Sequence, residues 1–332
     1  MSNKILVIGP SWVGDMIMAQ GLFKLLKNLH PQSIIDVVAP PWCEPLLPRM
    51  AEVNTAMVLP IAHGELGLAR RYRLGKTLAE QAYDWAIVVP RTFKSALVPW
   101  FASIPRRTGF LGEMRYGLIN DIRARAKSPR KPVIEQYLSL ASDQPPGSAP
   151  PHPTLAIDYV TQRAALDRLD LPADTRVVGF APGAEYGPAK RWPPARFAEL
   201  AEALAQQDTR VWIFGSAKDR PIGEQIMSAA NSSNLVNLCG RTTLPEAIDL
   251  LACCETVVAN DSGLMHAAAA VGSNVVALYG STPPAYAPPL TDKGKIIHHD
   301  LPCCPCFKRE CPLGHLNCLS GIGAREVLDC IE

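Results

Sequence analysis

Short apolar runs alternate with longer helical patterns along most of this chain, and the alternation limits the folds that it can adopt. Lys4–Gly9 is a short apolar run that ends in glycine. Asp15–His30 follows, with its apolar residues at helical spacing, and Pro31 closes it. Because strands that alternate with helices form right-handed β-α-β units, we expect open parallel sheets covered by helices.

The alternation occurs twice, and a proline-rich stretch separates the two series. The predicted strands are 4–9, 34–39, 57–59, 85–89, 177–181, 210–214, 235–238, 256–259 and, as the last strand of the chain, 275–278. The predicted helices are 15–30, 194–207, 219–230, 244–252, one through 267–270, and 324–330. We therefore expect two Rossmann-like, doubly wound domains, 1–142 and 159–332, joined by a linker over 143–158 with a cleft between the domains.

Length and composition fit this arrangement. The chain has 332 residues, enough for two cores, and an apolar content of 48% that is typical of soluble globular proteins. Asp15 interrupts the first apolar run, so no secretory signal is expected. The stretch Ser262–Thr291 is almost uncharged, but Gly272-Ser273-Asn274 divides it into a helix and a strand, and Pro283-Pro284 ends it. We expect a cytoplasmic protein.

The net charge is unevenly distributed. Residues 1–150 carry 18 Lys and Arg against 11 Asp and Glu, whereas residues 151–332 carry 15 against 20. Such a basic half is either a solvated face or a surface that meets an anionic partner such as a phosphorylated acceptor or a membrane. No motif indicates nucleic-acid binding. The cations include Arg70, Arg71, Arg73, Lys76, Arg106, Arg107, Arg115, Arg123, Arg125, Lys127, Arg130 and Lys131.

The loop after the first strand, 9–15, has two glycines that allow a tight turn and close approach of a ligand. It contains neither the dinucleotide fingerprint nor a P-loop. Asp15 then stands at the start of a helix. It is either a helix cap or a carboxylate that acts as general base.

Three loops of the second half also follow predicted strands. The loop 181–192 ends in Lys190 and Arg191, which are either solvated charges or a phosphate site. The turn 260–266 places Asp261, Ser262 and Gly263 before a helix, where they either cap the helix or bind a diphosphate. In the turn 214–219, Asp219 is most simply a cap, and hydrogen bonding to a ribose hydroxyl is the alternative.

Several long motifs resemble those of the heptosyltransferases of glycosyltransferase family 9. They are Ile5–Met16, Phe93–Pro99, Gly112–Gly117, Pro182–Pro193, Phe214–Asp219 and Asn260–His266. The resemblance covers about residues 4–290 and implies the GT-B fold, with inversion at the anomeric carbon and no obligatory metal. It implies transfer of L-glycero-D-manno-heptose from ADP-heptose to the first heptose of the lipopolysaccharide inner core. The acceptor molecule would be heptosyl-Kdo2-lipid A. The enzyme would then lie peripherally at the inner leaflet.

The resemblance also assigns roles. Asp15 would be the general base, and Lys190 would offset charge on the leaving diphosphate. The residues expected to bind the donor are Gly183, Ala184, Lys190, Gly215, Ser216, Asp219, Asp261, Ser262, Gly263 and His266. The residues expected to bind the acceptor are Ser11, Trp12, Gly14, Lys94 and Arg115.

Six of the ten cysteines fall in the last 30 residues. Cys303, Cys306, Cys311, His315 and Cys318 have spacing that would suit zinc or an iron–sulfur cluster. The spacing fits no standard finger well, so reduced thiols or one disulfide are favoured. Other functions remain open: a transferase with another acceptor or ADP-sugar, a nucleotide-sugar epimerase, or a non-enzymatic nucleotide-binding scaffold.

Overall fold

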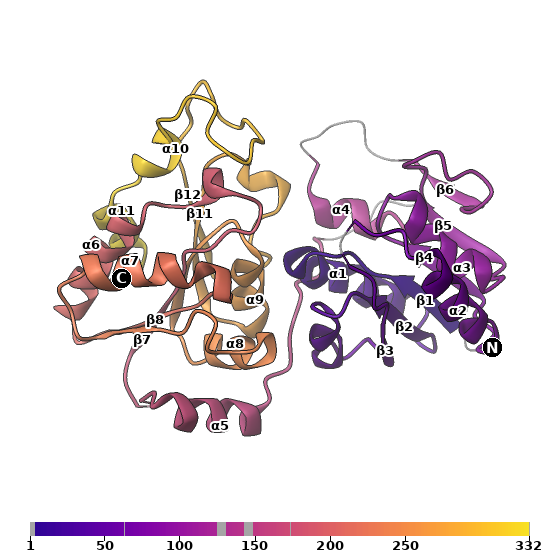
Figure 1. The fold of residues 1–332 in the computed structure, drawn as a ribbon, viewed down its shortest axis with the longest axis horizontal. Coiled ribbons are helices and arrows are strands. Elements are labelled where there is room, and N and C mark those ends of the chain that lie inside the picture. The colour runs from indigo at the N-terminus through magenta and orange to yellow at the C-terminus, as the bar shows by residue number, and fades with distance from the viewer. Residues whose placement is uncertain (1–3, 63, 125–130, 143–148, 173, 332) are drawn as a thin grey trace. The chain divides into compact units, whose positions relative to one another are not determined.

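The structure, a computed structural model, describes residues 4–62, 64–124, 131–142, 149–172 and 174–331. The chain divides after Pro153 into two compact units, unit 1 (Met1–Pro153) and unit 2 (Thr154–Glu332) (Figure 1). The predicted linker 143–158 spans this boundary, and its residues 143–148 lie outside the described part.

Unit 1 is built on a parallel sheet. Its described residues form six strands in the order β3-β2-β1-β4-β5-β6. The strands are β1 (Lys4–Ile8), β2 (Ile34–Ala39), β3 (Thr55–Val58), β4 (Trp85–Val88), β5 (Arg106–Phe110) and β6 (Asp121–Arg123). The central strands are almost wholly buried, which is why they read as continuous apolar runs rather than alternating ones.

Helices cover both faces of this sheet (Figure 1). The α-helices are α1 (Val13–Leu29), α2 (Leu68–Ala79), α3 (Leu97–Phe101) and α4 (Val133–Leu138), and two 3-10 turns are η1 (Glu44–Arg49) and η2 (Phe93–Ala96). Helix α1 packs with α4, and α2 packs with α3. A Cβ at Gly75 would lie 2.5 Å from that of Phe101, so the glycine permits the close approach of α2 to α3.

Unit 2 repeats the architecture. Over the residues described there, six parallel strands run in the order β12-β11-β10-β7-β8-β9. These are β7 (Val177–Ala181), β8 (Arg210–Ile213), β9 (Leu235–Asn237), β10 (Thr256–Asn260), β11 (Asn274–Tyr279) and β12 (Gly294–His298). The helices are α5 (Tyr159–Leu169), α6 (Pro194–Ala205), α7 (Arg220–Ala229), α8 (Leu244–Leu251), α9 (Gly263–Val271), α10 (Asn317–Ser320) and α11 (Ala324–Ile331), with 3-10 turns η3 (Pro188–Lys190), η4 (Ala217–Asp219) and η5 (Pro284–Tyr286).

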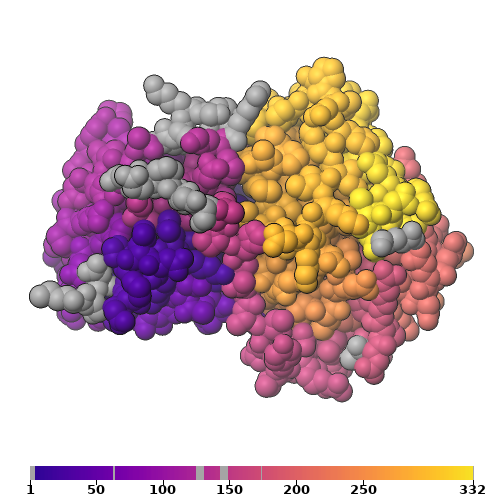
Figure 2. Space-filling view, turned by 180° about the vertical axis from the view of Figure 1, so that it is seen from behind, coloured from indigo at the N-terminus to yellow at the C-terminus, as the bar shows by residue number. Residues whose placement is uncertain are grey.

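One apolar core lies between the sheet of unit 2 and helices α6, α7 and α11, and α8 and α9 lie on the other face (Figure 1). Within this core, the Phe197 ring of α6 packs at a tilt against Phe180 of β7 and edge to face against Trp192. Helix α11 packs against α6 although the two are far apart in the sequence (Figure 2). Helix α11 therefore covers part of the apolar core of unit 2.

The strand order reverses once in each sheet. In unit 1 the reversal lies between β1 and β4, and in unit 2 it lies between β7 and β10. The connections from the two strands at such a point run to opposite sides of the sheet, which leaves an opening at their carboxyl ends. The loops that follow these four strands are therefore the expected binding loops of the two units.

The elements that were predicted agree with the structure within a few residues, but three strands and the helices α2, α3, α4, α5 and α10 were not predicted. The strand 275–278 is not the last one, because β12 follows it at the sheet edge. The first three residues of β12 are exposed, so it lacks the continuous apolar signal of the inner strands. The strands β5 and β6 were also missed.

The described basic residues of unit 1 do not form one solvated face, and Arg125, Lys127 and Arg130 lie outside the described residues. Arg115 is fully buried, and burial lowers its pKa to about 10. Its guanidinium donates to the carbonyls of Phe110, Pro90 and Thr92 and to the Ser95 hydroxyl. This argues against the predicted contact between Arg115 and the acceptor, because its donors already hold the chain together. Arg71 and Arg123 are buried as well.

Ser262–Thr291 forms the end of the turn after β10, then α9, β11 and η5. In the part of the chain that the structure describes, no helix is long and apolar enough to span a membrane.

We predict that Arg115→Met lowers the free energy of unfolding by about 2–4 kcal/mol, because the buried Phe110 carbonyl and the half-buried Pro90 and Thr92 carbonyls lose their donors. Arg91→Met, which changes an exposed side chain nearby, should cost less than about 0.5 kcal/mol. Denaturant unfolding of both variants measures the difference. Equal losses would contradict the structural role of Arg115.

Candidate active site

The loop after β1 is held in place by contacts with the segment that follows β2. The Gly9 amide donates to the Val38 carbonyl at 2.9 Å. The Ser11 carbonyl accepts from the Trp42 indole at 2.7 Å and from the Cys43 thiol at 3.4 Å. These hydrogen bonds fix the loop that contains Ser11 and Trp12. Gly14 follows in the first turn of helix α1.

Asp15 lies in the first turn of α1, where the helix dipole favours its negative charge. It is not the N-cap, since Trp12 occupies that position. Burial, together with the charge of Asp15, raises the pKa of Cys43 to about 12. The Asp15 carboxylate stands beyond the carboxyl end of β1 and is half-buried.

The loop after β4 lies next to the loop after β1, because their strands are neighbours. The buried Arg115 guanidinium holds this loop in place by donating to the Pro90 and Thr92 carbonyls. Lys94 donates to the Glu65 carbonyl at 3.1 Å and is half-buried. Trp12 and Phe93 are 43% and 44% exposed. Four of the five residues predicted for the acceptor thus stand on two adjacent loops.

In unit 2, Lys190 and Asp261 form a buried ion pair between the loops after β7 and β10. Their side chains are only 13% and 8% exposed. The Asp261 carboxylate also accepts from the Thr282 hydroxyl at 2.6 Å. Burying two charges costs several kcal/mol of desolvation free energy per ion. Stabilisation of the fold alone therefore does not account for this buried ion pair.

Polar atoms without a partner surround this ion pair. Ser262 Oγ, His266 Nδ1 and Ser281 Oγ are buried and have no hydrogen-bond partner among the described residues. Ser262 is the N-cap of α9, yet its side chain does not cap the helix. Burial lowers the pKa of His266 to about 4, with Asp261 opposing and Lys190 reinforcing the shift. The imidazole is therefore neutral.

The first turn of α9 adds amide donors to this group. Amides at a helix start have no partner within the helix, and they favour an anion. Buried polar groups in native proteins are nearly always paired, so the unpaired hydroxyls and the imidazole indicate a polar ligand. Together with Lys190, the site can take an anion of the size of a phosphate or diphosphate.

Asn260 connects the two loops, and the sequence reasoning missed it. Its side-chain oxygen accepts from the Trp192 amide at 3.0 Å, and its amide group donates to the Pro182 carbonyl at 2.7 Å. Asn260 is fully buried at the end of β10. A buried polar residue at the carboxyl end of a central strand was the available signal. Thr282 and Ser281, after β11, were missed too.

A strap formed by residues 307–309 crosses the Lys190 loop. The Tyr186 hydroxyl donates to the Phe307 carbonyl at 2.7 Å, and the Ala189 amide donates to the Arg309 carbonyl at 3.0 Å. The Phe307 amide in turn donates to the Ser281 carbonyl at 2.8 Å. The Lys190 ammonium lies 5.0 Å from the Tyr186 ring centre. The strap therefore fixes the loop from which Lys190 projects.

The loop after β8 supports the loop after β7. Asp219 accepts from the Ser216 amide at 2.9 Å and from its hydroxyl at 2.7 Å, in a capping box that begins η4. A Cβ at Gly183 would lie 2.5 Å from Asp219, and one at Gly215 would lie 2.7 Å from it. Both glycines therefore permit close packing. This geometry agrees with the interpretation of Asp219 as a cap.

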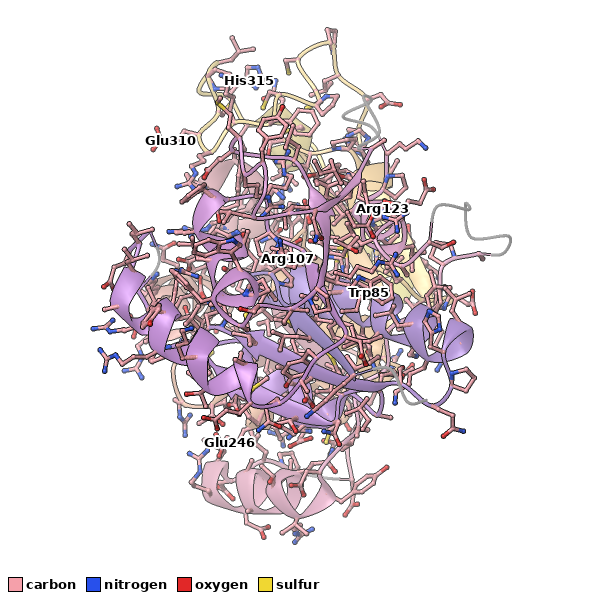
Figure 3. The ribbon with its side chains drawn as sticks, turned by 90° about the vertical axis from the view of Figure 1, so that its right-hand side faces the viewer. Trp85, Arg107, Arg123, Glu246, Glu310 and His315 are labelled. Carbon is pink, nitrogen blue, oxygen red and sulfur yellow. The ribbon has the colours of Figure 1, made fainter. Side chains whose placement is uncertain are left out.

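The cysteine-rich segment follows β12, and Figure 3 labels Glu310 and His315 on it. All ten cysteines are free thiols. Five of them and His315 line a cavity of about 20 Å³. Among the residues described, no group of three His, Cys, Asp or Glu side chains is arranged so that it could hold a metal ion. The lining cysteines are Cys303, Cys304, Cys306, Cys311 and Cys318.

Comparison with known proteins identifies relatives over most of the chain. The family model "Glycosyltransferase family 9 (heptosyltransferase)" matches residues 71–317. Lipopolysaccharide heptosyltransferase 2 of Salmonella typhimurium is 48% identical over 304 residues, which span 89% of this chain and 87% of that protein. Lipooligosaccharide heptosyltransferase 2 of Haemophilus influenzae is 49% identical over 305 residues, or 88% of each chain.

A solved structure agrees over nearly the full length. The ADP-heptose lipopolysaccharide heptosyltransferase II of Escherichia coli superposes with a TM-score of 0.88 at 43% identity, covering 99% of this chain and 97% of that one. The two six-stranded parallel sheets match its GT-B fold, as predicted. The family match covers more than half of the chain and the sequence relatives cover almost nine-tenths of it. The chain therefore belongs to glycosyltransferase family 9, the heptosyltransferases.

Proposed function

We propose that this glycosyltransferase moves L-glycero-D-manno-heptose from ADP-heptose to the first heptose of heptosyl-Kdo2-lipid A, with inversion at the anomeric carbon. The observation that carries the proposal is the buried Lys190–Asp261 pair beside unpaired Ser262 and His266. Such a site suits a nucleoside diphosphate. The identity of 48% to an enzyme named lipopolysaccharide heptosyltransferase 2 supports the choice of donor and acceptor.

On the donor side, unit 2 binds the diphosphate of ADP-heptose. The Ser262 hydroxyl and the first amides of α9 contact phosphate oxygens, and Gly263 lets the chain approach them. Neutral His266 adds a hydrogen bond. Gly183, Ala184, Gly215 and Ser216 form the neighbouring loops, and Asp219 supports those loops rather than contacting the donor.

Lys190 offsets the negative charge that develops on the ADP leaving group. Electrostatic stabilisation of this kind is usually the largest contribution to catalysis, and a fixed ammonium provides it without a metal ion. Asp261 holds the ammonium in place through its buried carboxylate. The ion pair is therefore arranged before the donor binds. The reaction that we propose requires no cofactor.

On the acceptor side, unit 1 binds the inner-core sugars on the loops after β1 and β4. Asp15 accepts the proton of the attacking hydroxyl as the new glycosidic bond forms. Ser11, Trp12, Gly14 and Lys94 contact the sugar, and the exposed Trp12 ring provides an apolar face for it. Arg115 positions the second loop without touching the ligand.

The acceptor is a membrane lipid, whereas ADP-heptose is a soluble nucleotide sugar. An enzyme that joins them must reach both, so we place it in the cytoplasm, at the inner leaflet of the inner membrane and peripheral to it. The basic balance of residues 1–150 supports this placement, because anionic lipid surfaces attract Lys and Arg.

We predict that Asp15→Asn lowers kcat about 10²–10⁴-fold, because the general base is lost, while the affinity for ADP stays within about twofold. Glu80→Gln, a matched change of an exposed carboxylate at the end of α2, should leave both unchanged. Transfer of labelled heptose to the acceptor gives kcat, and calorimetry gives the ADP affinity. Full activity of Asp15→Asn would remove the assigned base.

We predict that Lys190→Met weakens ADP binding about 10–100-fold, because a charge-assisted contact worth roughly 1.5–3 kcal/mol is lost. Lys218→Met is the matched control, since Lys218 is exposed and its ion pair with Glu185 is exposed as well. Calorimetry with ADP compares the two. Lys190→Met leaves the Asp261 carboxylate buried without its partner, so the double variant Lys190→Met/Asp261→Asn should regain stability without regaining affinity. Unchanged ADP affinity in both Lys190 variants would refute the proposal.

We predict that Tyr186→Phe raises the KM for ADP-heptose about 3–10-fold, because the loss of one hydrogen bond loosens the strap over the Lys190 loop. Stability should fall by less than about 1.5 kcal/mol. Tyr159→Phe, at an exposed position of α5, is the control. Initial rates at varied donor concentration separate KM from kcat, and a KM equal to that of the wild type would show that the hydroxyl has no positioning role.

A further inference from the structure

The outer side of helices α2 and α3 in unit 1 carries an open hollow of about 550 Å³. Neither Asp15 nor Lys94 is among the residues that line it. Tyr72 and Lys76 of α2 form one wall, and Trp100 and Phe101 of α3 form another. Ser103 and Arg107 complete it. Arg107 is labelled in Figure 3, in which unit 1 faces the viewer.

The hollow is positively charged. None of the described residues that line it is acidic. Lys76 is exposed, and its ammonium lies 5.6 Å from the centre of the Tyr72 ring. The Arg107 guanidinium donates to the carbonyls of Ile104, Leu118 and Gly117, so it is fixed in position without a carboxylate to neutralise it. The site is therefore complementary to an anionic partner.

The hollow also exposes aromatic surface. Tyr72 is 48% exposed and Trp100 is 46% exposed. Both pack edge-on or tilted against Phe101, with ring centres 5.1 Å apart in each pair, which holds the exposed rings in position. Trp and Tyr that are half in contact with apolar surface and half exposed are typical of the interface between a membrane and water.

The apolar surface continues along α2. Leu68, Tyr72 and Lys76 are spaced four residues apart, so they lie on one face of the helix. Leu68 is 51% exposed and Lys76 is exposed. Arg73, also exposed, adds a further cation to the same helix. An exposed stripe of leucine, tyrosine and lysine beside a tryptophan suits the headgroup region of a lipid bilayer.

We propose that this face of α2 and α3 is the surface by which unit 1 binds an anionic lipid bilayer. The aromatic rings enter the headgroup layer, and the Lys76 ammonium contacts lipid phosphates. Arg107, whose guanidinium is held by backbone carbonyls, adds positive charge to the surface. The inference rests on the proposed function in one respect, since a lipid-linked acceptor gives the enzyme a reason to bind a membrane. An isolated soluble phosphate fits less well, because the hollow is open and its aromatic rings would gain nothing from such a ligand.

Flotation of the full chain with lipid vesicles tests the proposal. The vesicles are phosphatidylcholine alone and a mixture of phosphatidylcholine with phosphatidylglycerol. The wild type should bind the mixed vesicles more strongly, and added salt should weaken the binding. Lys76→Ala should reduce the partition coefficient about fivefold, at about 1 kcal/mol per cation. Trp100→Ala should reduce it about tenfold, because aromatic area no longer leaves water.

Two variants on α5 of unit 2 serve as matched controls. Tyr159→Ala removes an exposed aromatic ring, and Arg163→Ala removes an exposed cation. Both should bind vesicles as the wild type does. Melting temperatures show whether each variant is folded. If Trp100→Ala fails to fold, Lys76→Ala decides the matter alone, because its exposed side chain contributes little to the fold.

Three outcomes would overturn the proposal. They are no preference of the wild type for anionic vesicles, equal losses in the control variants, or vesicle binding that free glycerol phosphate abolishes at concentrations near those of the lipid. Transfer to a soluble, deacylated acceptor separates this surface from the proposed function. Lys76→Ala should keep the wild-type rate in that assay. Transfer without vesicle binding would refute only the membrane surface, and vesicle binding without transfer would refute only the proposed reaction.

Discussion

The reversal of strand order in each parallel sheet is the constraint on which the rest of this structure depends. It brings the loops after β1 and β4 together in unit 1, and the loops after β7 and β10 together in unit 2. Every residue that we assign to a direct role in chemistry lies on or beside one of these loops. The buried strands supply rigidity, and the polar chemistry is confined to their carboxyl ends, as open parallel sheets of this type require.

Within unit 2, the buried Lys190–Asp261 ion pair carries a desolvation cost that opposes folding. Burial of two charges alone does not favour folding, and the neighbouring Ser262 and His266 have polar atoms with no partner. Asn260 and the strap 307–309 hold the surrounding loops, so the groups are arranged before any ligand arrives. The diphosphate of the proposed donor would accept from the Lys190 ammonium and the Ser262 hydroxyl, so the proposed function gives this arrangement a purpose.

The sequence predicts much of the fold, because buried strands and amphipathic helices leave local patterns. It missed β5, β6 and β12, and the first three residues of β12 are exposed and carry no continuous apolar run. It also could not show that Arg115 is buried. The roles of Asp15, Lys190 and Asp261 came from a family resemblance, since a carboxylate at a helix start has several ordinary explanations. Asn260, Tyr186 and the strap depend on contacts between residues far apart in the chain, which no local pattern encodes.

The most direct test of the account is the structure of the product formed from ADP-heptose and heptosyl-Kdo2-lipid A. Mass spectrometry and nuclear magnetic resonance of the purified product give its mass and anomeric configuration. The account predicts the gain of one heptose, joined to the existing heptose in the anomeric configuration opposite to that of the donor, with release of ADP. Conversion or hydrolysis of ADP-heptose with an unchanged acceptor, or retention of configuration, would contradict it.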